Sequence, residues 1–281
     1  MLRGVYRIKG LQDDEFLMWN LKTHEEHGVK YFTSSLLEKF KFVRHAFSTR
    51  CGGVSEGPYE SLNLAVEKGE DPKRVKENRR RFFKATGLAL ERMVEVNQVH
   101  GANVVDASKV LAEGGEPADG LITGVPGVAV AIQTADCVPV LLVDPFNRAV
   151  AAVHAGRHGT AVGVLVSAVI GMRRNFGSKP HNLVAALGPG ISGQFYEVGE
   201  ECISPFLLRY PGWREFCVQV GGRQWLLNLP EAVRLQLVSA GVPEEAIDLA
   251  PYCTFSESSK FFSYRRDGAP TGRQLSVIEI T

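Results

Sequence analysis

Long hydrophobic runs are absent from the 281-residue sequence. A membrane-spanning helix needs roughly 20 consecutive apolar residues, and no segment approaches that length. The first residues, MLRGVYRIKGLQDDEFLMW, carry scattered charges where a secretory signal would have an apolar core. Net charge is also lacking: the formal value is +1, so no basic field predicts nucleic acid as a partner. We therefore expect a cytoplasmic protein that contacts neither membranes nor nucleic acids.

Cysteine is scarce as well, and the five cysteines are widely spaced, with no CxxC pair. The odd number and the spacing exclude a disulfide-stapled scaffold and a four-cysteine zinc module. A free cysteine is by default a small buried hydrophobe. We expect this packing role for Cys51, Cys202, Cys217 and Cys253.

Helix and strand signals are mixed along the chain, without an internal repeat or a linker. A helix is predicted over residues 71–87, with Asp71 as N-cap, Pro72 in the first turn and Gly87 at the C-terminal stop. Further helices are expected over about 160–176 and over 228–241, with Asn228 as cap. Strands are expected at 93–101, within 128–155, and as a closing pair around a turn in FFSYRRDGAPTGRQLSVIEI.

Strands outnumber helices and occur in both hairpin and crossover contexts. This pattern predicts an α+β fold in which mixed β-sheets lie between outer helices. We expect one domain over residues 1–281, with residues 1–40 as a variable lead-in.

Three side chains that can ligate metals stand at predicted strand ends: His100 in NQVHG, Cys137 in TADCVP and His154 in AVHAG. Strand ends that enter loops commonly present functional groups. Two imidazoles and a thiolate form a set that zinc accepts, and three protein ligands leave the fourth tetrahedral position open, as in catalytic zinc sites. The same residues also fit a metal-free hydrolase, with Cys137 as nucleophile and His154 as base.

Several segments together resemble one known family. They are STRCGGVSEGPYESLNLA, NQVHGANV, ADGLIT, TADCVPVLLVDP, AVHAGRHGT, ALGPGISGQFYEVG and FFSYRRDGAPTGRQLSVI, in this order. The chain resembles the polyphenol-oxidase/YfiH-like family, also called the laccase-domain or multicopper-oxidase-like proteins. The resemblance implies a single αββα-type domain that binds one zinc ion through His100, Cys137 and His154. It also implies purine nucleoside phosphorylase activity, with adenosine deaminase and methylthioadenosine phosphorylase activity.

The chain departs from the family pattern after His154. The family usually has HAGWRG where this sequence has HAGRHG, so Arg157 and His158 replace a tryptophan and an arginine. If the family arginine holds phosphate, His158 would do so only partly and with pH dependence, unless Arg157 swings in. His158 could alternatively be a fourth metal ligand, although Gly156 and Gly159 indicate a loop here.

Phosphorolysis of a nucleoside requires an anion cradle and groups that read the purine. For the cradle, the glycine loop of HAGRHGT offers amide groups, and Arg50 offers a guanidinium fork. Arg265 or Arg266 could add a second fork. Strand alternation would point one of these two inward; the sequence does not say which, and Arg266 is the candidate that we name. The amides of Gln98 and Asn63 are candidates for contacts with the purine.

Asp136 and Cys137 are the candidate catalytic residues. Asp136 could act as general base or orient a ligand histidine, or it could simply cap a turn. A multicopper oxidase is a poor alternative, because such enzymes carry more histidines, in His-x-His pairs. This chain has seven histidines and no such pair. Copper could still bind in vitro at a His-Cys-His site. A non-catalytic binding module is the remaining alternative.

Overall fold

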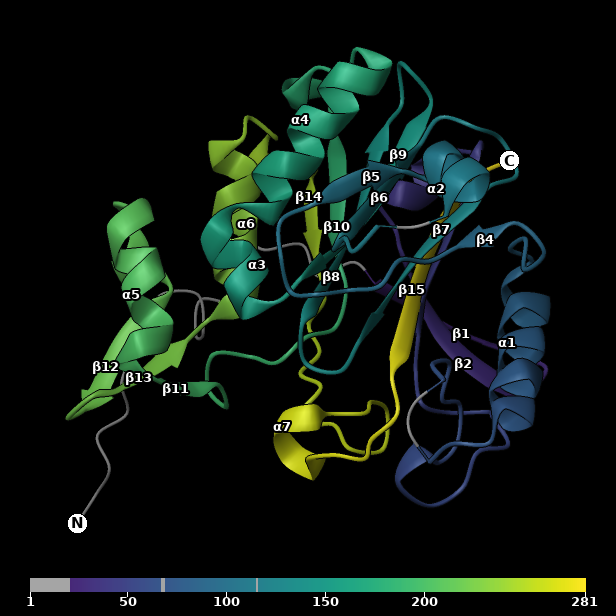
Figure 1. The fold of residues 1–281 in the computed structure, drawn as a ribbon, viewed down its shortest axis with the longest axis horizontal. Coiled ribbons are helices and arrows are strands. Elements are labelled where there is room, and N and C mark those ends of the chain that lie inside the picture. Colours follow the sequence, from purple (N-terminus) through teal and green to yellow (C-terminus); the bar gives the residue numbers. More distant parts are fainter. Residues whose placement is uncertain (1–20, 67–68, 115) are drawn as a thin grey trace.

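The computed structural model describes residues 21–66, 69–114 and 116–281. Two six-stranded sheets pack face to face, and a three-stranded sheet projects to one side (Figure 1). The first large sheet consists, in spatial order, of β1 (Leu21–Glu26), β2 (Val29–Ser34), β3 (Val43–Ser48), β15 (Gln274–Ile280), β7 (Ala129–Thr134) and β4 (Met93–Val94). The second consists of β14 (Ile247–Leu249), β10 (Val184–Leu187), β8 (Val138–Asp144), β9 (Ala149–Ala155), β6 (Gly120–Thr123) and β5 (Val104–Asp106).

Helices cover the outer faces of the two large sheets. Helix α1 (Pro72–Thr86) lies on the first sheet, where Phe82 and Phe83 meet Ala129 and Ala131 of β7. Helices α3 (Arg157–Val162), α4 (Val164–Phe176) and α6 (Leu229–Ser239) lie on the second. The layers are therefore helix, sheet, sheet, helix, which confirms the predicted αββα arrangement.

The remaining elements lie at the edges. Helix α2 (Ala107–Glu113) follows β5 directly, and the one-turn helix α7 (Tyr264–Asp267) precedes β15. The projecting sheet has the order β11 (Glu197–Gly199), β13 (Gln224–Leu227) and β12 (Cys217–Gly221), and α5 (Glu200–Arg209) packs on it. Short 3-10 turns occupy Leu37–Lys39, Gly57–Tyr59, Pro180–Asn182, Trp213–Glu215 and Glu244–Ala246.

Alternation along the strands divides the apolar residues between layers. In β8, Val138, Val140 and Leu142 face the helices, whereas Leu141 and Val143 face the opposite sheet. Each strand of the central pair is thus buried on both sides, which explains its nearly continuous apolar sequence.

Two predicted helices are confirmed with their caps. The Asp71 carboxylate accepts a hydrogen bond from the Lys73 amide, and α1 ends at Gly87, whose φ is 68°. The Asn228 side chain accepts from the Glu231 amide and starts α6. The single helix expected over 160–176 is wrong: the chain breaks at Gly163, φ 98°, into α3 and α4.

Two of the predicted strand segments contain less strand than expected. Only Met93–Val94 of the expected 93–101 strand pairs in a sheet, because the residues after it turn to bond a buried carboxylate. The closing segment has one strand, β15, and its first expected strand is α7. Within the expected lead-in, β1 and β2 form the edge of the first sheet, and residues 1–20 lie outside the described residues. No helix in the described ranges is long and apolar enough to cross a membrane.

We predict that Phe47→Ala lowers the free energy of unfolding by about 3–5 kcal/mol. Phe47 is 1% exposed on β3, between the sheets, and Gly188 packs so closely on its ring that a Cβ there would lie 2.3 Å from Phe47 Cδ1. Chemical denaturation measures the change. Phe146, which is 74% exposed, is the matched control, and its replacement by alanine should cost less than about 0.5 kcal/mol. Equal losses in the two variants would contradict the assignment of the core.

Candidate metal centre and its pocket

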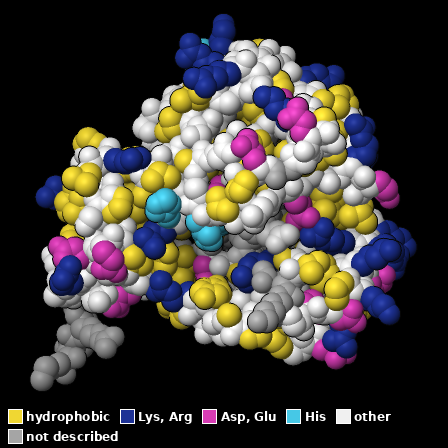
Figure 2. Space-filling model, viewed as in Figure 1, with side chains coloured by type: hydrophobic (Ala, Val, Ile, Leu, Met, Phe, Trp, Pro, Cys, Tyr) yellow, Lys and Arg dark blue, Asp and Glu magenta, His cyan; other side chains and the backbone are white. Residues whose placement is uncertain are grey.

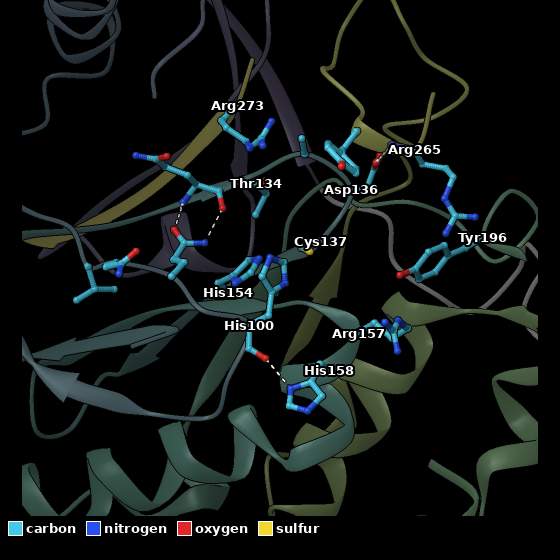
Figure 3. A pocket seen from close by; sticks show the side chains of 16 residues that line it. His100, Thr134, Asp136, Cys137, His154, Arg157, His158, Tyr196, Arg265 and Arg273 are labelled. Carbon is cyan, nitrogen blue, oxygen red and sulfur yellow. Dashed lines mark hydrogen bonds between the residues drawn. The ribbon is translucent and has the colours of Figure 1, made fainter. Parts of the chain in front are cut away.

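His100, Cys137 and His154 converge from three different segments. His100 lies in the loop after β4, Cys137 in the connection from β7 to β8, and His154 near the end of β9. Their candidate ligand atoms all lie within 4.8 Å of one another, and the two imidazole rings meet edge to face at 4.7 Å between centroids (Figure 3). Among the described residues, this is the one group of histidine, cysteine and acidic side chains with the geometry to share a metal ion.

The three side chains differ in burial and therefore in freedom. His154 is buried, Cys137 is partly buried and His100 is exposed. Ligand atoms around a tetrahedral zinc ion are roughly 3.3–3.7 Å apart, given bonds of about 2.0–2.3 Å. His100 is the member of the group with the most exposed side chain. The donor set, one thiol and two imidazoles, fits zinc or copper.

The backbone is strained on two sides of this group. His100 has φ 59° and Asp136, next to Cys137, has φ 93°. Non-glycine residues rarely adopt such values, and where they do the surrounding contacts hold them, often at functional sites.

A buried carboxylate that was missed at the sequence level lies beneath the group. Asp119, immediately before β6, accepts a hydrogen bond from His154 Nδ1 at 2.7 Å. It also accepts from the backbone amides of Val99, His100 and Gly101, at 3.3, 2.9 and 2.6 Å. ADGLIT offered a signal for it, because an acidic residue stands there before an apolar strand.

The two glycines of HAGRHG allow helix α3 to pack closely against the His100 loop. A Cβ on Gly156 would lie 2.7 Å from His100 Nδ1 and 3.2 Å from Cys137 Sγ. A Cβ on Gly159 would lie 2.6 Å from the Gly101 carbonyl oxygen. The predicted loop is therefore wrong: the segment is the start of α3, with Gly156 as N-cap, and the glycines let this helix approach the His100 loop.

The thiol and the imidazole of His154 perturb each other's titration. Burial raises the pKa of Cys137, but the neighbouring His154 and His100 outweigh burial and lower it to about 6. Burial lowers the pKa of His154, but the Cys137 thiolate and the Asp119 carboxylate raise it to about 9. Between these two values the metal-free protein holds a thiolate beside an imidazolium.

The triad lies in a pocket of about 760 Å³. In Figure 2, histidine side chains reach the surface near the centre of the visible face, beside Lys and Arg side chains. The lining comprises Val96, Asn97, Gln98, His100, Gln133, Thr134, Ala135, Asp136, Cys137, His154, Arg157, His158, Tyr196, Tyr264, Arg265 and Arg273. It includes three arginines against a single carboxylate, so the pocket favours anions.

Arg157 and Arg265 flank Tyr196 on one side of the triad (Figure 3). The Arg265 guanidinium lies 4.7 Å from the centre of the Tyr196 ring, and its Nη1 donates to the Glu197 carbonyl. Burial and the Cys137 thiolate raise the pKa of Tyr196, although the two arginines oppose this. No salt bridge joins either arginine to a carboxylate among the described residues, so both charges are available to a ligand.

Arg273 and Thr134 lie on the other side of the triad (Figure 3). The Thr134 hydroxyl is buried without a hydrogen-bond partner. A buried hydroxyl without a partner is costly, and its position in the lining makes it a candidate contact for a ligand.

Three of the predicted site residues line the pocket with their polar atoms already engaged. Gln98 donates to and accepts from the backbone of Gln133, both at 2.8 Å, and so extends the sheet pairing beyond β4. His158 Nδ1 donates to the His100 carbonyl at 2.9 Å. The Asp136 carboxylate accepts from the Thr254 hydroxyl and from the Arg265 amide, so it fixes α7 to the Cys137 loop.

Three other predicted residues lie outside the lining. The Arg50 guanidinium donates to the carbonyls of Glu60 and Ser258. Asn63 is buried, and its side chain bonds Ala65, Glu70 and the Arg273 amide. The Arg266 guanidinium donates to the carbonyls of Thr254, Phe255 and Phe261 and to the Asp267 carboxylate.

Arg265, not Arg266, faces the pocket. The alternation argument failed because the two residues lie on α7, not on a strand.

Comparison with known proteins matches residues 44–281 to a family described as multi-copper polyphenol oxidoreductase laccase. The chain belongs to this family. It is 44% identical over 236 residues to a purine nucleoside phosphorylase of Deinococcus radiodurans, which covers 84% of this chain and 88% of that protein. It is 39% identical over 243 residues to the purine nucleoside phosphorylase YfiH of Escherichia coli, which covers 85% and 94%.

Solved structures of the family share the fold. The crystal structure of the hypothetical protein YfiH from Bacillus licheniformis superimposes with a TM-score of 0.84, at 30% identity, over 92% of this chain and 99% of that chain. That of YlmD from Geobacillus stearothermophilus gives 0.83 at 33% identity, over 92% and 97%. The resemblance noted in the sequence is thus confirmed.

We predict that the Cys137 thiol of the metal-free protein is alkylated with a pH midpoint near 6, because the flanking imidazoles lower its pKa. The reaction should fade as the pH falls through 6. His154→Ala removes the larger of the two lowering interactions while most of the burial remains, so alkylation at pH 7 should slow by roughly tenfold. Peptide-level mass spectrometry measures the rate, with the partly exposed Cys51 as internal control. A wild-type midpoint near 9 would contradict the thiolate–imidazolium pair.

Proposed function

We propose that the chain is a zinc-dependent purine nucleoside phosphorylase, which converts adenosine or inosine and phosphate to the free base and ribose 1-phosphate. Methylthioadenosine phosphorylase and adenosine deaminase activities are part of the proposal. The observation that carries it is the convergence of His100, Cys137 and His154 at the floor of a cationic pocket. The names of the phosphorylase relatives support the substrate class.

His100, Cys137 and His154 would hold the zinc ion. A zinc ion so held supplies a Lewis acid, which can withdraw charge from a departing purine or activate water for deamination. Three protein ligands leave one position for this chemistry. The low pKa of Cys137 supports a thiolate ligand at neutral pH.

The chain's own residues bring the second substrate into place. In phosphorolysis a phosphate oxygen bonds to C1′ of the ribose, and the C1′–N bond breaks with its electron pair passing to the base. Arg157 and Arg265 can grip phosphate with paired N–H donors, and His158 belongs to the same lining. The Tyr196 ring holds the Arg265 guanidinium in position by cation–π contact.

The nucleoside then takes the other side of the triad. There, the Thr134 hydroxyl can meet a polar group of the substrate, and the exposed Tyr264 ring offers a surface for stacking. Gln98 contributes by holding this wall, since its amide is committed to Gln133. Asp136 likewise holds α7, and with it Arg265, against the Cys137 loop.

A metal-free cysteine hydrolase is the second candidate, and the thiolate–imidazolium pair favours it. The pair has the polarity of an activated nucleophile and its acid. The two functions differ in their response to chelators, because only the zinc enzyme needs the ion. Copper oxidase chemistry has less support, because the described residues contain one candidate metal group instead of several.

We predict that purified protein contains about one zinc ion per chain and releases free purine from adenosine and inosine only when phosphate is present. Chelation should abolish the release, and added zinc should restore it. Cys137→Ala should lose both metal and turnover, measured by elemental analysis and by chromatography of the base. Cys217→Ala, a buried cysteine remote from the pocket lining, is the matched control. Full metal content and turnover in Cys137→Ala would refute the site, and activity that survives chelation would favour the hydrolase.

We predict that Arg265→Ala raises the KM for phosphate about 10–100-fold, because it removes a charged hydrogen-bond donor to the anion. The substitution keeps the backbone amide that bonds Asp136. Arg265→Lys should recover part of the loss. Arg223→Ala is the control: this arginine lies on the projecting sheet, where it pairs with Glu200. Unchanged phosphate kinetics in Arg265→Ala would place the anion elsewhere.

A further inference from the structure

We propose that Asp119 is the positioning residue that assembles the metal centre, by orienting one ligand side chain and the backbone of another at the same time. The inference rests on the proposed function only in assuming that zinc is the ion. Asp119 is not among the site residues predicted from the sequence.

The first half of this role concerns His154. A carboxylate oxygen only accepts hydrogen bonds, so the contact of 2.7 Å between Asp119 Oδ1 and His154 Nδ1 places the ring proton on Nδ1. Nε2 is then the ring atom left for the metal. His154 is nearly fully buried, so its ring has no alternative partner in water. A carboxylate behind a ligand histidine fixes the tautomer and the ring orientation and strengthens the ligand.

The second half concerns the His100 loop. The same carboxylate accepts a hydrogen bond from the His100 amide at Oδ1 and another from the Gly101 amide at Oδ2. These bonds hold His100 at its φ of 59°, which the chain would otherwise avoid. His100 itself is exposed, so its side chain has few packing contacts to place it. Its direction is set mainly through the backbone that Asp119 grips.

The position of Asp119 is in turn fixed by the sheet. Gly120, the next residue, is paired with Val153 in the β6–β9 ladder, and the Asp119 carbonyl accepts from the His154 amide at 2.7 Å. Asp119 is 0% exposed. A carboxylate so buried is costly unless every oxygen is bonded, and here both oxygens are bonded to the two segments that bear ligands.

The chain offers a matched control in Asp144. This aspartate is also 0% exposed, and it also accepts backbone amides, those of Phe146 and Asn147 in the turn after β8. It bonds none of the three ligand residues. A purely structural role for a buried aspartate is therefore represented by Asp144→Asn.

The experiment is a zinc titration of the full chain against a chelator of known affinity, without substrate. Asp119→Asn keeps the side-chain volume but sets an NH₂ group against N–H donors. We expect it to weaken zinc binding about 10–100-fold, whereas Asp144→Asn stays within about twofold of wild type. Zinc should also raise the thermal midpoint of Asp119→Asn much less than that of the control. Equal zinc affinity in Asp119→Asn and Asp144→Asn would overturn the inference.

A second measurement uses the wild-type protein and covers the case in which Asp119→Asn fails to fold. Nitrogen-detected NMR of the zinc-loaded chain should show His154 protonated at Nδ1 and ligated through Nε2. Ligation through Nδ1 would overturn the inference. Failure of the proposed function alone looks different: the zinc affinities would separate as expected while no purine is released. A wild-type chain that does not bind zinc would overturn the inference as well.

Discussion

The candidate metal centre depends on the register of three neighbouring strands. In the β8–β9 ladder Val138 pairs with Ala155 and Pro139 with His154, so Cys137 emerges beside the end of β9. In the β6–β9 ladder Gly120 pairs with Val153, which sets Asp119 behind His154. A slip of one residue would turn His154 to the opposite face of the sheet. Every other feature of the site presupposes that these ladders are in place.

Hydrophobic pattern alone cannot fix that register, because β9 is buried on both faces. The strand instead has small residues at defined places, with Ala151 toward the helices and Ala152 toward the first sheet. The polar bonds at its end supply the rest, since the His154 amide and ring are both held by Asp119. The polar groups of the candidate site thus also help to specify how the strands pair.

The sequence predicted the layered α+β fold and the helices with clear capping residues. It could not predict where strand 93–101 stops, because that depends on a carboxylate nearly twenty residues further along. The ligand triad came from strand-end positions and from family resemblance together. The side chains of Arg50, Asn63 and Arg266 could bind a ligand by their chemistry. In the fold, however, their donor groups form hydrogen bonds with backbone carbonyls and buried polar groups of the protein itself. Tertiary contacts decide which polar groups of a pocket remain available to a ligand. Such contacts cannot be predicted from the residue types one at a time.

Tyr196 directly precedes β11 of the projecting sheet, outside the two-sheet sandwich that supplies the three ligands. The side of the cavity that Tyr196 forms and the floor are therefore built on separate parts of the architecture. Substitutions in the small sheet can widen or narrow the cavity while the ion-binding floor keeps its geometry. A lineage could exchange one bound ligand for another through such changes, with no interval in which the His-Cys-His group is lost.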